Sequence, residues 1–386
     1  MLLHKHTLLQ FIPTALEIYV KEKTITFKNK KLKTSYLADI CHFFITKWYF
    51  KDQESINLHS SILRSKYGTW YNYYMEWLQE KGFLTILTKY FVGKKSCTWR
   101  MPKMHLNANV KRYINSDKVI IKKWIRNNME WKLEEISNID IDWLKRKLIQ
   151  DLEFVELDFE SAMQELDREL EIGLIDQRSY VKNVMCIEAI HDKSIFWTWD
   201  EYGRLHTNFT VLKRTLRNNF ITINGEQIAE LDIKNSQPYF LSMLMEKELI
   251  DDDEFKEWKN IVYSGKVYET LSEGNDLSRS DSKRMMYKVL FGRNYSDKWN
   301  IMFAERWPKI YEWIKKTKEK SGLYASLAHE LQKMESSVVF EMICAKIKRQ
   351  YPHIKIFTVH DSIFFPARYH DLISSVFYEY VDLATY

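Results

Sequence analysis

Cysteine, glycine and proline are all scarce in this chain of 386 residues, which contains 4, 10 and 6 of them respectively. The four cysteines are scattered and form no C-x-x-C pair, which argues against a zinc site or a disulfide framework and favours a reducing compartment. Few glycines and prolines indicate long regular elements. No apolar run reaches membrane-spanning length, so the sequence predicts a cytoplasmic protein with no membrane partner.

The net charge of +6 is unevenly distributed. Residues 1–130 hold 23 Lys and Arg against 9 Asp and Glu, whereas residues 151–172 hold 9 acidic residues and a single Arg. The simplest interpretation is that the basic first third meets a polyanionic partner. A basic surface that only keeps the protein soluble is the alternative.

Residues 1–106 contain a pattern of helices followed by a hairpin. "SILRSKYG" and "TWYNYYMEWLQEKG" predict two helices, and "FLTILTKYF" and "SCTWRM" predict the two strands. This order resembles a winged-helix module. In that family the second helix and the wing approach nucleic acid, which would bring Tyr73, Lys94 and Lys95 near phosphates. Winged helices also act as protein-protein spacers, and the sequence leaves both roles open.

Residues 107–180 show a helical pattern throughout, first basic and then acidic. High charge at helical spacing predicts long, partly exposed, antiparallel helices. From about residue 183 the pattern changes to alternating strands and helices.

Two acidic residues stand at the ends of predicted strands. "GEQIAELDIKNSQPYFLSML" (225–244) predicts a strand that ends at Asp232, then a helix, and "FTVHDSIFF" (357–365) places Asp361 in a turn. Each has an ordinary explanation alone, a helix cap and a hairpin turn. If adjacent strands bring both acids together they repel, and magnesium, which needs few carboxylates, is the usual remedy. Two such ions would suit in-line phosphoryl transfer.

Between these acids, residues 278–295 predict a helix that carries Arg279, Lys283, Tyr287 and Phe291 at a spacing of four. Residues at this spacing share one helix face. Two cations followed by two aromatic rings suit a ligand with a polyphosphate at one end and a planar base at the other. The alternative is a solvated basic helix whose aromatic side is buried.

The order of these three segments resembles motifs A, B and C of the family A nucleic-acid polymerases, which include bacterial and phage DNA polymerases and single-subunit RNA polymerases. Two further segments are similar: 201–217 to the Gly-Arg segment before motif A, and 329–343 to the helix before motif C. The similarity covers about residues 195–386.

The resemblance implies an α+β right-hand fold. Its palm, with an antiparallel sheet, and its helical fingers would occupy residues 191–386, with the fingers at about 246–325. Residues 107–190 would be a thumb-like helical region after the winged-helix-like domain.

Carried over residue by residue, the resemblance implies that Asp232 and Asp361 bind two Mg²⁺ ions, with Mn²⁺ as the alternative metal. The backbone carbonyl of Ile233 would help to hold them. Arg279 and Lys283 would grip the incoming triphosphate, and Lys283 would also act in catalysis. Positioning and electrostatics would then carry the reaction.

The resemblance also implies roles for five more side chains. Tyr287 and Phe291 would pack on the sugar and base of the nucleotide. Arg204, Gln332 and His360 would lie near the template-primer, with His360 at the primer terminus.

Three positions depart from the pattern of the DNA polymerases. Ser362 follows Asp361 where those enzymes usually have Glu, as in single-subunit RNA polymerases. Gln237 stands where a Glu typically blocks the ribose 2′-hydroxyl. Phe291 stands where Tyr is usual, and its missing hydroxyl favours deoxynucleotides.

On balance the sequence predicts a DNA polymerase that uses DNA template-primer and dNTPs. An RNA polymerase or primase-like enzyme using RNA or rNTPs is the rival, and a non-catalytic nucleic-acid-binding protein is the alternative of another class. No D-x-E strand in an exonuclease setting is found, so we expect no proofreading. The compact form indicates a phage or mobile element in a bacterial cytoplasm.

Overall fold

The computed structural model confirms a mixed α+β fold whose sheets are antiparallel. It describes residues 2–4, 7–51, 53–89, 96–106, 110–125, 143–193, 195–273, 277–295, 297–320, 322 and 324–381. The chain divides into two compact units. The first comprises Met1–Arg146, Val155–Phe196 and Val211–Ile221, and the second comprises Lys147–Phe154, Trp197–Thr210 and Thr222–Tyr386.

The first unit combines small antiparallel sheets with helices. Strands β1, β2 and β8 form one sheet, β3 and β4 form a hairpin, and β5, β7 and β6 form a third sheet in that order. The strands are β1 (Leu2–His4), β2 (Thr7–Pro13), β3 (Thr24–Phe27), β4 (Lys30–Lys33), β5 (Ile56–Leu58), β6 (Thr85–Thr88), β7 (Cys97–Arg100), β8 (Val110–Asn115) and β9 (Val155–Leu157). The helices are α1 (Glu17–Val20), α2 (Thr34–Lys51), α3 (Ser60–Tyr67), α4 (Tyr71–Glu80), α5 (Lys118–Ile125), α8 (Phe159–Glu171), α9 (Gln177–His191) and α11 (Arg214–Phe220).

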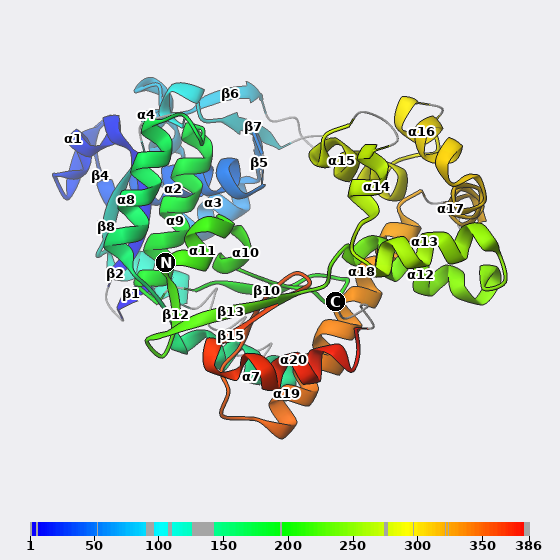
Figure 1. The fold of residues 1–386 in the computed structure, drawn as a ribbon. Coiled ribbons are helices and arrows are strands. Elements are labelled where there is room, and N and C mark those ends of the chain that lie inside the picture. The colour runs from blue at the N-terminus through cyan, green and yellow to red at the C-terminus, as the bar shows by residue number, and fades with distance from the viewer. Residues whose placement is uncertain are drawn as a thin grey trace. The chain divides into compact units, whose positions relative to one another are not determined.

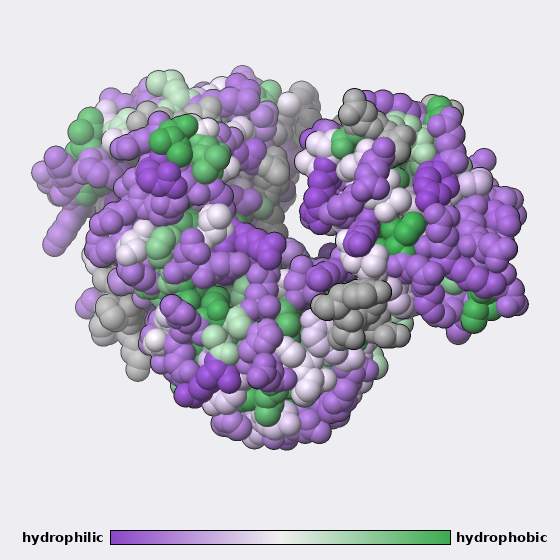
Figure 2. Space-filling view, viewed as in Figure 1, coloured by the Kyte–Doolittle hydropathy of each residue, from purple (hydrophilic) through white to green (hydrophobic). Residues whose placement is uncertain are grey.

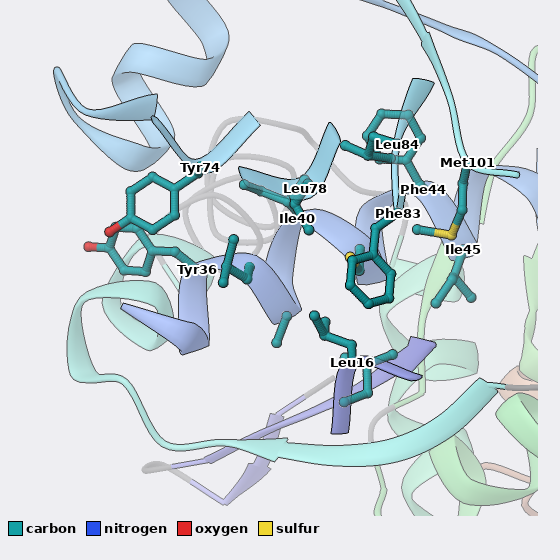
Figure 3. Close-up of a cluster of buried hydrophobic side chains, with 14 of the residues drawn as sticks. Leu16, Tyr36, Ile40, Phe44, Ile45, Tyr74, Leu78, Phe83, Leu84 and Met101 are labelled. Atoms are coloured by element: carbon teal, nitrogen blue, oxygen red, sulfur yellow. The ribbon is translucent and has the colours of Figure 1, made fainter. Parts of the chain in front are cut away.

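Helix α2 forms the centre of the first unit's core. Its residues Ile40, Phe44 and Ile45 are buried: Ile40 and Phe44 share one face at a spacing of four, and Ile45 extends the buried surface around the helix. Figure 3 shows Leu78 of α4 and Phe83 packed in the same cluster. The two predicted helices before the hairpin are therefore held to the unit by apolar burial.

Strand β8 contradicts the expectation that residues 107–180 are helical throughout. Residues Val110–Asn115 pair with β2 in an antiparallel register that runs from Pro13↔Val110 to Leu8↔Asn115. The partner strand lies about a hundred residues earlier in the chain, so its hydrogen bonds override the local helical pattern. In the acidic part of the segment, strand β9 also contradicts the expectation, whereas α8 is helical as expected.

The second unit contains a sheet with the predicted strand-turn-strand at one side. Strands β14 (Phe357–Val359), β15 (Ser362–Pro366), β13 (Glu226–Asp232) and β12 (Ile221–Ile223) follow one another in that order, and helices α19 (Ala345–Gln350) and α20 (His370–Tyr378) lie along the sheet (Figure 1). All residues of β14 and β15 are buried, and the rings of Phe357 and Phe364 stack with centroids 4.7 Å apart.

Helices form the remainder of the second unit, together with the hairpin of β10 (Trp197–Trp199) and β11 (Leu205–Thr207). These helices are α10 (Asn208–Val211), α12 (Ser236–Leu249), α13 (Asp253–Tyr263), α14 (Val267–Glu273), α15 (Arg279–Phe291), α16 (Lys298–Arg306), α17 (Pro308–Lys320) and α18 (Ser326–Ser336), and a π-helix (Ser337–Cys344) continues α18. Helices α12 to α17 gather together in Figure 1. The rings of Trp258, Phe303 and Trp307 contact one another and are fully buried. The outer surface of these helices is mostly hydrophilic (Figure 2).

Helix α7 (Trp143–Asp151) ends at a buried carboxylate that belongs to the second unit. Asp151 forms an ion pair with Lys348 of α19, and both side chains are almost inaccessible to solvent. The Lys348 ammonium also donates to the carbonyl of Ile354 at 2.7 Å, and the backbone N–H of Ile356 donates to Asp151 at 3.1 Å. These bonds compensate the loss of hydration that burial imposes on both charges.

Among the described residues, no helix combines the length and the apolarity that crossing a membrane requires.

A buried lysine caps the carboxyl end of α15 by bonding to its last carbonyls. The Lys318 ammonium on α17 donates to the carbonyls of Val289 at 2.5 Å and Gly292 at 2.8 Å. The residue is 3% exposed, and burial lowers the pKa of its amine from 10.5 to about 8. The cation also lies at the negative end of the helix dipole, where it is favoured.

We predict that this lysine makes stability depend on pH. Between pH of about 8 and 10.5 the unfolded chain binds the Lys318 proton and the folded chain does not, so stability should rise with pH. Relative to Lys318→Met, the wild-type free energy of unfolding should increase by up to about 3 kcal/mol across this window. Urea denaturation of both proteins at stepped pH measures the difference.

Lys316→Met is the matched control, because that lysine lies on the same helix with a side chain 71% exposed. Its difference from the wild type should stay constant with pH. A constant difference for Lys318→Met as well would contradict the prediction.

Candidate active site

The register between β13 and β15 brings the two predicted carboxylates together. Asp232, the last residue of β13, pairs with Ser362, the first residue of β15, and Asp361 directly precedes Ser362. Val359 pairs with Ser362 across the hairpin, so that only His360 and Asp361 form the turn. His360 adopts a left-handed backbone conformation with φ of 54°, which a two-residue turn of this kind requires. We call Asp232 and Asp361 the carboxylate pair.

The electrostatics of the carboxylate pair indicate crowded negative charge. Burial, followed by the charges of Asp232 and Glu335, raises the pKa of Asp361 to about 8. A hydrogen bond from the Ser236 side chain acts in the opposite direction. The hydroxyl of Ser362 lies 3.1 Å from Asp232 and 3.0 Å from Glu230 and can donate its single proton to either, so a proton donor lies between two carboxylates.

The carboxylate pair fits a hard divalent cation. Oxygen ligands, two carboxylates and a nearby backbone carbonyl are the donor set that Mg²⁺ accepts together with water and substrate phosphates. Burial is the main cause of the raised pKa of Asp361, and the repulsion from Asp232 and Glu335 adds to it; a bound cation would offset both. Within the described ranges, no group of three or more His, Cys, Asp or Glu side chains could hold a metal ion, so a bound ion would depend on non-protein ligands as well.

Glu335 lies beside the pair, and the sequence analysis did not identify it. Its side chain is 3% exposed and accepts from Arg204 Nη2 at 2.6 Å. Its other oxygen accepts from Ser236 Oγ at 2.6 Å and from Gln237 Nε2 at 2.5 Å. We call these four residues the Glu335 network.

A sequence signal for Glu335 does exist. Leu327, Leu331 and Glu335 follow one another at a spacing of four on α18, and all three are buried. An ionisable residue at a position where the helix period predicts an apolar one indicates a buried charge that needs a partner. On this helix the sequence instead predicts Gln332 as a residue near the template-primer. The Gln332 side chain is half-buried, and its contact with a primer stays a prediction.

The β10–β11 turn positions Arg204 for this network. The Asp200 carboxylate accepts from the backbone N–H groups of Tyr202 at 3.0 Å and Arg204 at 2.9 Å, and from the His206 ring at 2.8 Å. Gly203 has φ of 85°, and a side chain there would reach within 3.5 Å of Ser336. The turn therefore approaches α18 closely. The His206 and His360 rings lie 6.0 Å apart.

Helix α15 carries the predicted cations and rings on its exposed side. Its buried residues include Met285, Met286 and Val289, whereas Lys283 and Tyr287 are exposed. The Lys283 ammonium lies 5.8 Å from the centroid of the Tyr287 ring. The predicted common face is thus confirmed for this helix.

One contact lies within this face and one connects it with α14. The Tyr287 and Phe291 rings, both on α15, lie 5.2 Å apart, and Arg279 pairs with Glu269 of α14 at 2.6 Å. Burial raises the pKa of the Tyr287 hydroxyl, and the charges of Asp361 and Glu335 raise it further. Tyr287 therefore lies within electrostatic reach of both the carboxylate pair and the Glu335 network.

Other predicted contacts lie in the first unit. Lys94 and Lys95 fall outside the described residues. Tyr73 is half-buried on α4. The exposed side of that helix carries Glu76 and Glu80, both within 3.6 Å of the Lys28 ammonium.

No protein-family model matches this sequence, and no curated protein matches it.

We predict that Arg204 stabilises the folded chain through Glu335. Arg204→Met leaves a buried carboxylate without its cation, which should lower the free energy of unfolding by about 3–5 kcal/mol. Arg284→Met is the matched control, because Arg284 pairs with Asp281 on an exposed helix face and should cost only about 0–1 kcal/mol. Chemical denaturation of both variants measures the two losses.

The double variant Arg204→Met/Glu335→Gln tests whether charge is the cause. It should be more stable than the sum of the single losses predicts, because it leaves no unpaired charge. Equal losses for Arg204→Met and Arg284→Met would contradict the prediction.

Proposed function

We propose that the chain is a template-directed nucleotidyltransferase of the family A polymerase type, which adds nucleotides to the 3′-hydroxyl of a primer. The observation that carries the proposal is the β13–β15 register, which sets Asp232 and Asp361 side by side. The exposed cationic and aromatic face of α15 belongs to the same compact unit. The charge of Asp361 adds to the effect of burial in raising the pKa of Tyr287.

In this proposal the carboxylate pair binds Mg²⁺, with the Ile233 carbonyl as an additional ligand. The bound metal would supply Lewis-acid stabilisation of the transferring phosphoryl group. Lys283 neutralises the triphosphate, with Arg279 farther along the same helix face. The rings of Tyr287 and Phe291 offer a stacking surface to the base. His360, in the turn before Asp361, faces the primer terminus.

The proposed architecture assigns the sheet of β13, β14 and β15 to a palm and the helices of residues 246–325 to fingers. The palm assignment is supported by the antiparallel order of the strands and by the carboxylates at their ends. The fingers assignment is supported by the helical structure of the described part of this range and by the place of α15 within it. Residues 107–190 would then serve as the thumb, with β8 as an added strand.

A winged-helix-like arrangement is proposed for the first unit, because α3 and α4 precede β6 and β7 and because the sheet order is β5, β7, β6. One observation favours a spacer role for α4 itself. Glu76 and Glu80 occupy its exposed side, and acidic residues repel phosphates.

Primer extension tests the proposal. The purified chain should extend a primed template in the presence of Mg²⁺, and Asp232→Asn or Asp361→Asn should reduce the rate at least about a thousandfold, because each removes a charge that holds metal. The assay is run with dNTPs and with rNTPs separately, so that either substrate reveals the activity.

Asp371→Asn is the matched control, because that carboxylate is fully exposed on α20 of the same unit. It should extend the primer at the wild-type rate. Extension that persists in Asp361→Asn would show that the carboxylate pair is not the catalytic site. Absence of extension by the wild type with both nucleotide types would contradict the proposed activity and would favour a non-catalytic nucleic-acid-binding protein.

A further inference from the structure

The hairpin of β3 and β4 concentrates positive charge in the first unit. Residues 21–33 contain six lysines and a single glutamate. Lys31 and Lys33 stand two residues apart in β4, so their side chains share one face of the hairpin. Leu32 points to the opposite face and is fully buried. The two lysines therefore point away from the core, and β4 itself lies at the periphery of the unit (Figure 1).

Ion pairs hold this hairpin against the neighbouring helices. The Lys28 ammonium lies 3.0 Å from Glu76 and 3.6 Å from Glu80 on α4. The Lys33 ammonium lies 2.9 Å from Asp117, whose carboxylate also accepts from backbone N–H groups in the first turn of α5. The hairpin is thus attached to α4 and to α5, and its other cations extend from a fixed support.

Four lysines next to these attachments have no acidic partner. Within the described part of the chain, Lys30 and Lys31 of the hairpin and Lys118 and Lys122 of α5 form no ion pair. Lys118 and Lys122 are exposed and share one face of α5 at a spacing of four, where like charges destabilise a helix. Cations that the protein itself does not neutralise suit a polyanionic partner.

An exposed indole adjoins these cations. Trp70, in the turn between α3 and α4, is 43% exposed, and the Lys30 ammonium lies 5.3 Å from the centroid of its ring. The end of α3 also meets α5, because the Lys123 ammonium donates to the carbonyls of Ser65 at 2.9 Å and Lys66 at 2.7 Å. The hairpin, the α3–α4 turn and α5 are therefore neighbours in one surface. We define the basic surface as Lys30, Lys31, Trp70, Lys118 and Lys122.

We propose that the basic surface binds a single strand of nucleic acid, with phosphates on the lysines and an unpaired base stacked on Trp70. Lysines neutralise phosphates without reading sequence. An exposed indole offers a stacking platform that an unpaired base can reach and a base inside a duplex cannot.

This contact lies outside the proposed active site. The basic surface belongs to the first unit, whereas the resemblance to polymerases covers about residues 195–386. It also differs from the contact that the winged-helix pattern predicts, which would use α4. The exposed side of α4 carries Glu76 and Glu80, which repel phosphates. The first unit would therefore hold nucleic acid through its hairpin and α5.

Salt-dependent binding tests the lysines. The full chain is titrated against fluorescently labelled oligo(dT), without metal or nucleotides, and binding is followed by anisotropy. Each phosphate contact on a single strand contributes about 0.7 to the slope of log K against log salt concentration. Lys31→Gln/Lys122→Gln should therefore flatten the slope by about 1.4 and weaken binding about tenfold at low salt.

Lys103→Gln/Lys111→Gln is the matched control for net charge. Both lysines are exposed in the same unit, and each is paired with a glutamate. This variant loses the same charge and should keep the wild-type slope. Equal flattening in the two double variants would show that only net charge attracts the strand and would overturn the inference. An unchanged slope in Lys31→Gln/Lys122→Gln would overturn it as well.

Trp70→Leu tests the stacking. It should weaken binding of oligo(dT) about tenfold and leave binding of a duplex of the same length within about twofold, because only the single strand offers unpaired bases. Trp70→Phe retains a ring and should keep most of the affinity. Tyr378→Leu, which removes an equally exposed ring from α20, is the control and should bind as the wild type does. Equal losses for single strand and duplex in Trp70→Leu, or no loss for either, would overturn the inference.

Binding to oligo(dT) requires no turnover, so the inference and the proposed function can fail separately. A chain that binds the strand through the basic surface but extends no primer would defeat only the proposed function. A chain that extends primers and whose salt slope is unaffected by Lys31→Gln/Lys122→Gln would defeat only this inference.

Discussion

The antiparallel pairing of β13 with β15 is the constraint on which the second unit's site depends. Both strands of the β14–β15 hairpin are buried on both faces, so a shift of one residue would turn Phe364 to the opposite face of the sheet and break its stacking on Phe357. The core therefore fixes the register, and the register fixes the place of the carboxylate pair. Hydrophobic packing, not any attraction between the two acids, holds Asp232 beside Asp361.

This arrangement crowds negative charge, and the side chains that bond to Glu335 partly offset the repulsion. A third carboxylate next to the pair raises the pKa of Asp361 further, and Arg204 and two polar side chains bond to that third carboxylate. Such a network stabilises the fold only if its members are satisfied, and several of its buried atoms are not. Unsatisfied groups beside crowded negative charge are typical of functional sites rather than of structural cores.

Local pattern was sufficient to predict the elements that carry the carboxylate pair and the α15 face. The strand before Asp232 and the turn at Asp361 follow from apolar runs that polar residues interrupt, and the exposed face with Lys283 and Tyr287 follows from a spacing of four residues. Two features depend on distant partners and could not be predicted in this way. Strand β8 exists because β2 pairs with it, and Glu335 belongs to the site because a turn more than 130 residues earlier brings Arg204 to it.

Gln237 illustrates why a resemblance in sequence is weaker than the contacts of the chain itself. By similarity, its amide is a near replacement for a carboxylate that blocks a hydroxyl. By geometry, its amino group is engaged with Glu335, and its buried oxygen has no hydrogen-bond partner among the described residues. The environment of this side chain thus depends on a residue 98 positions away, which the local sequence pattern around Gln237 does not contain.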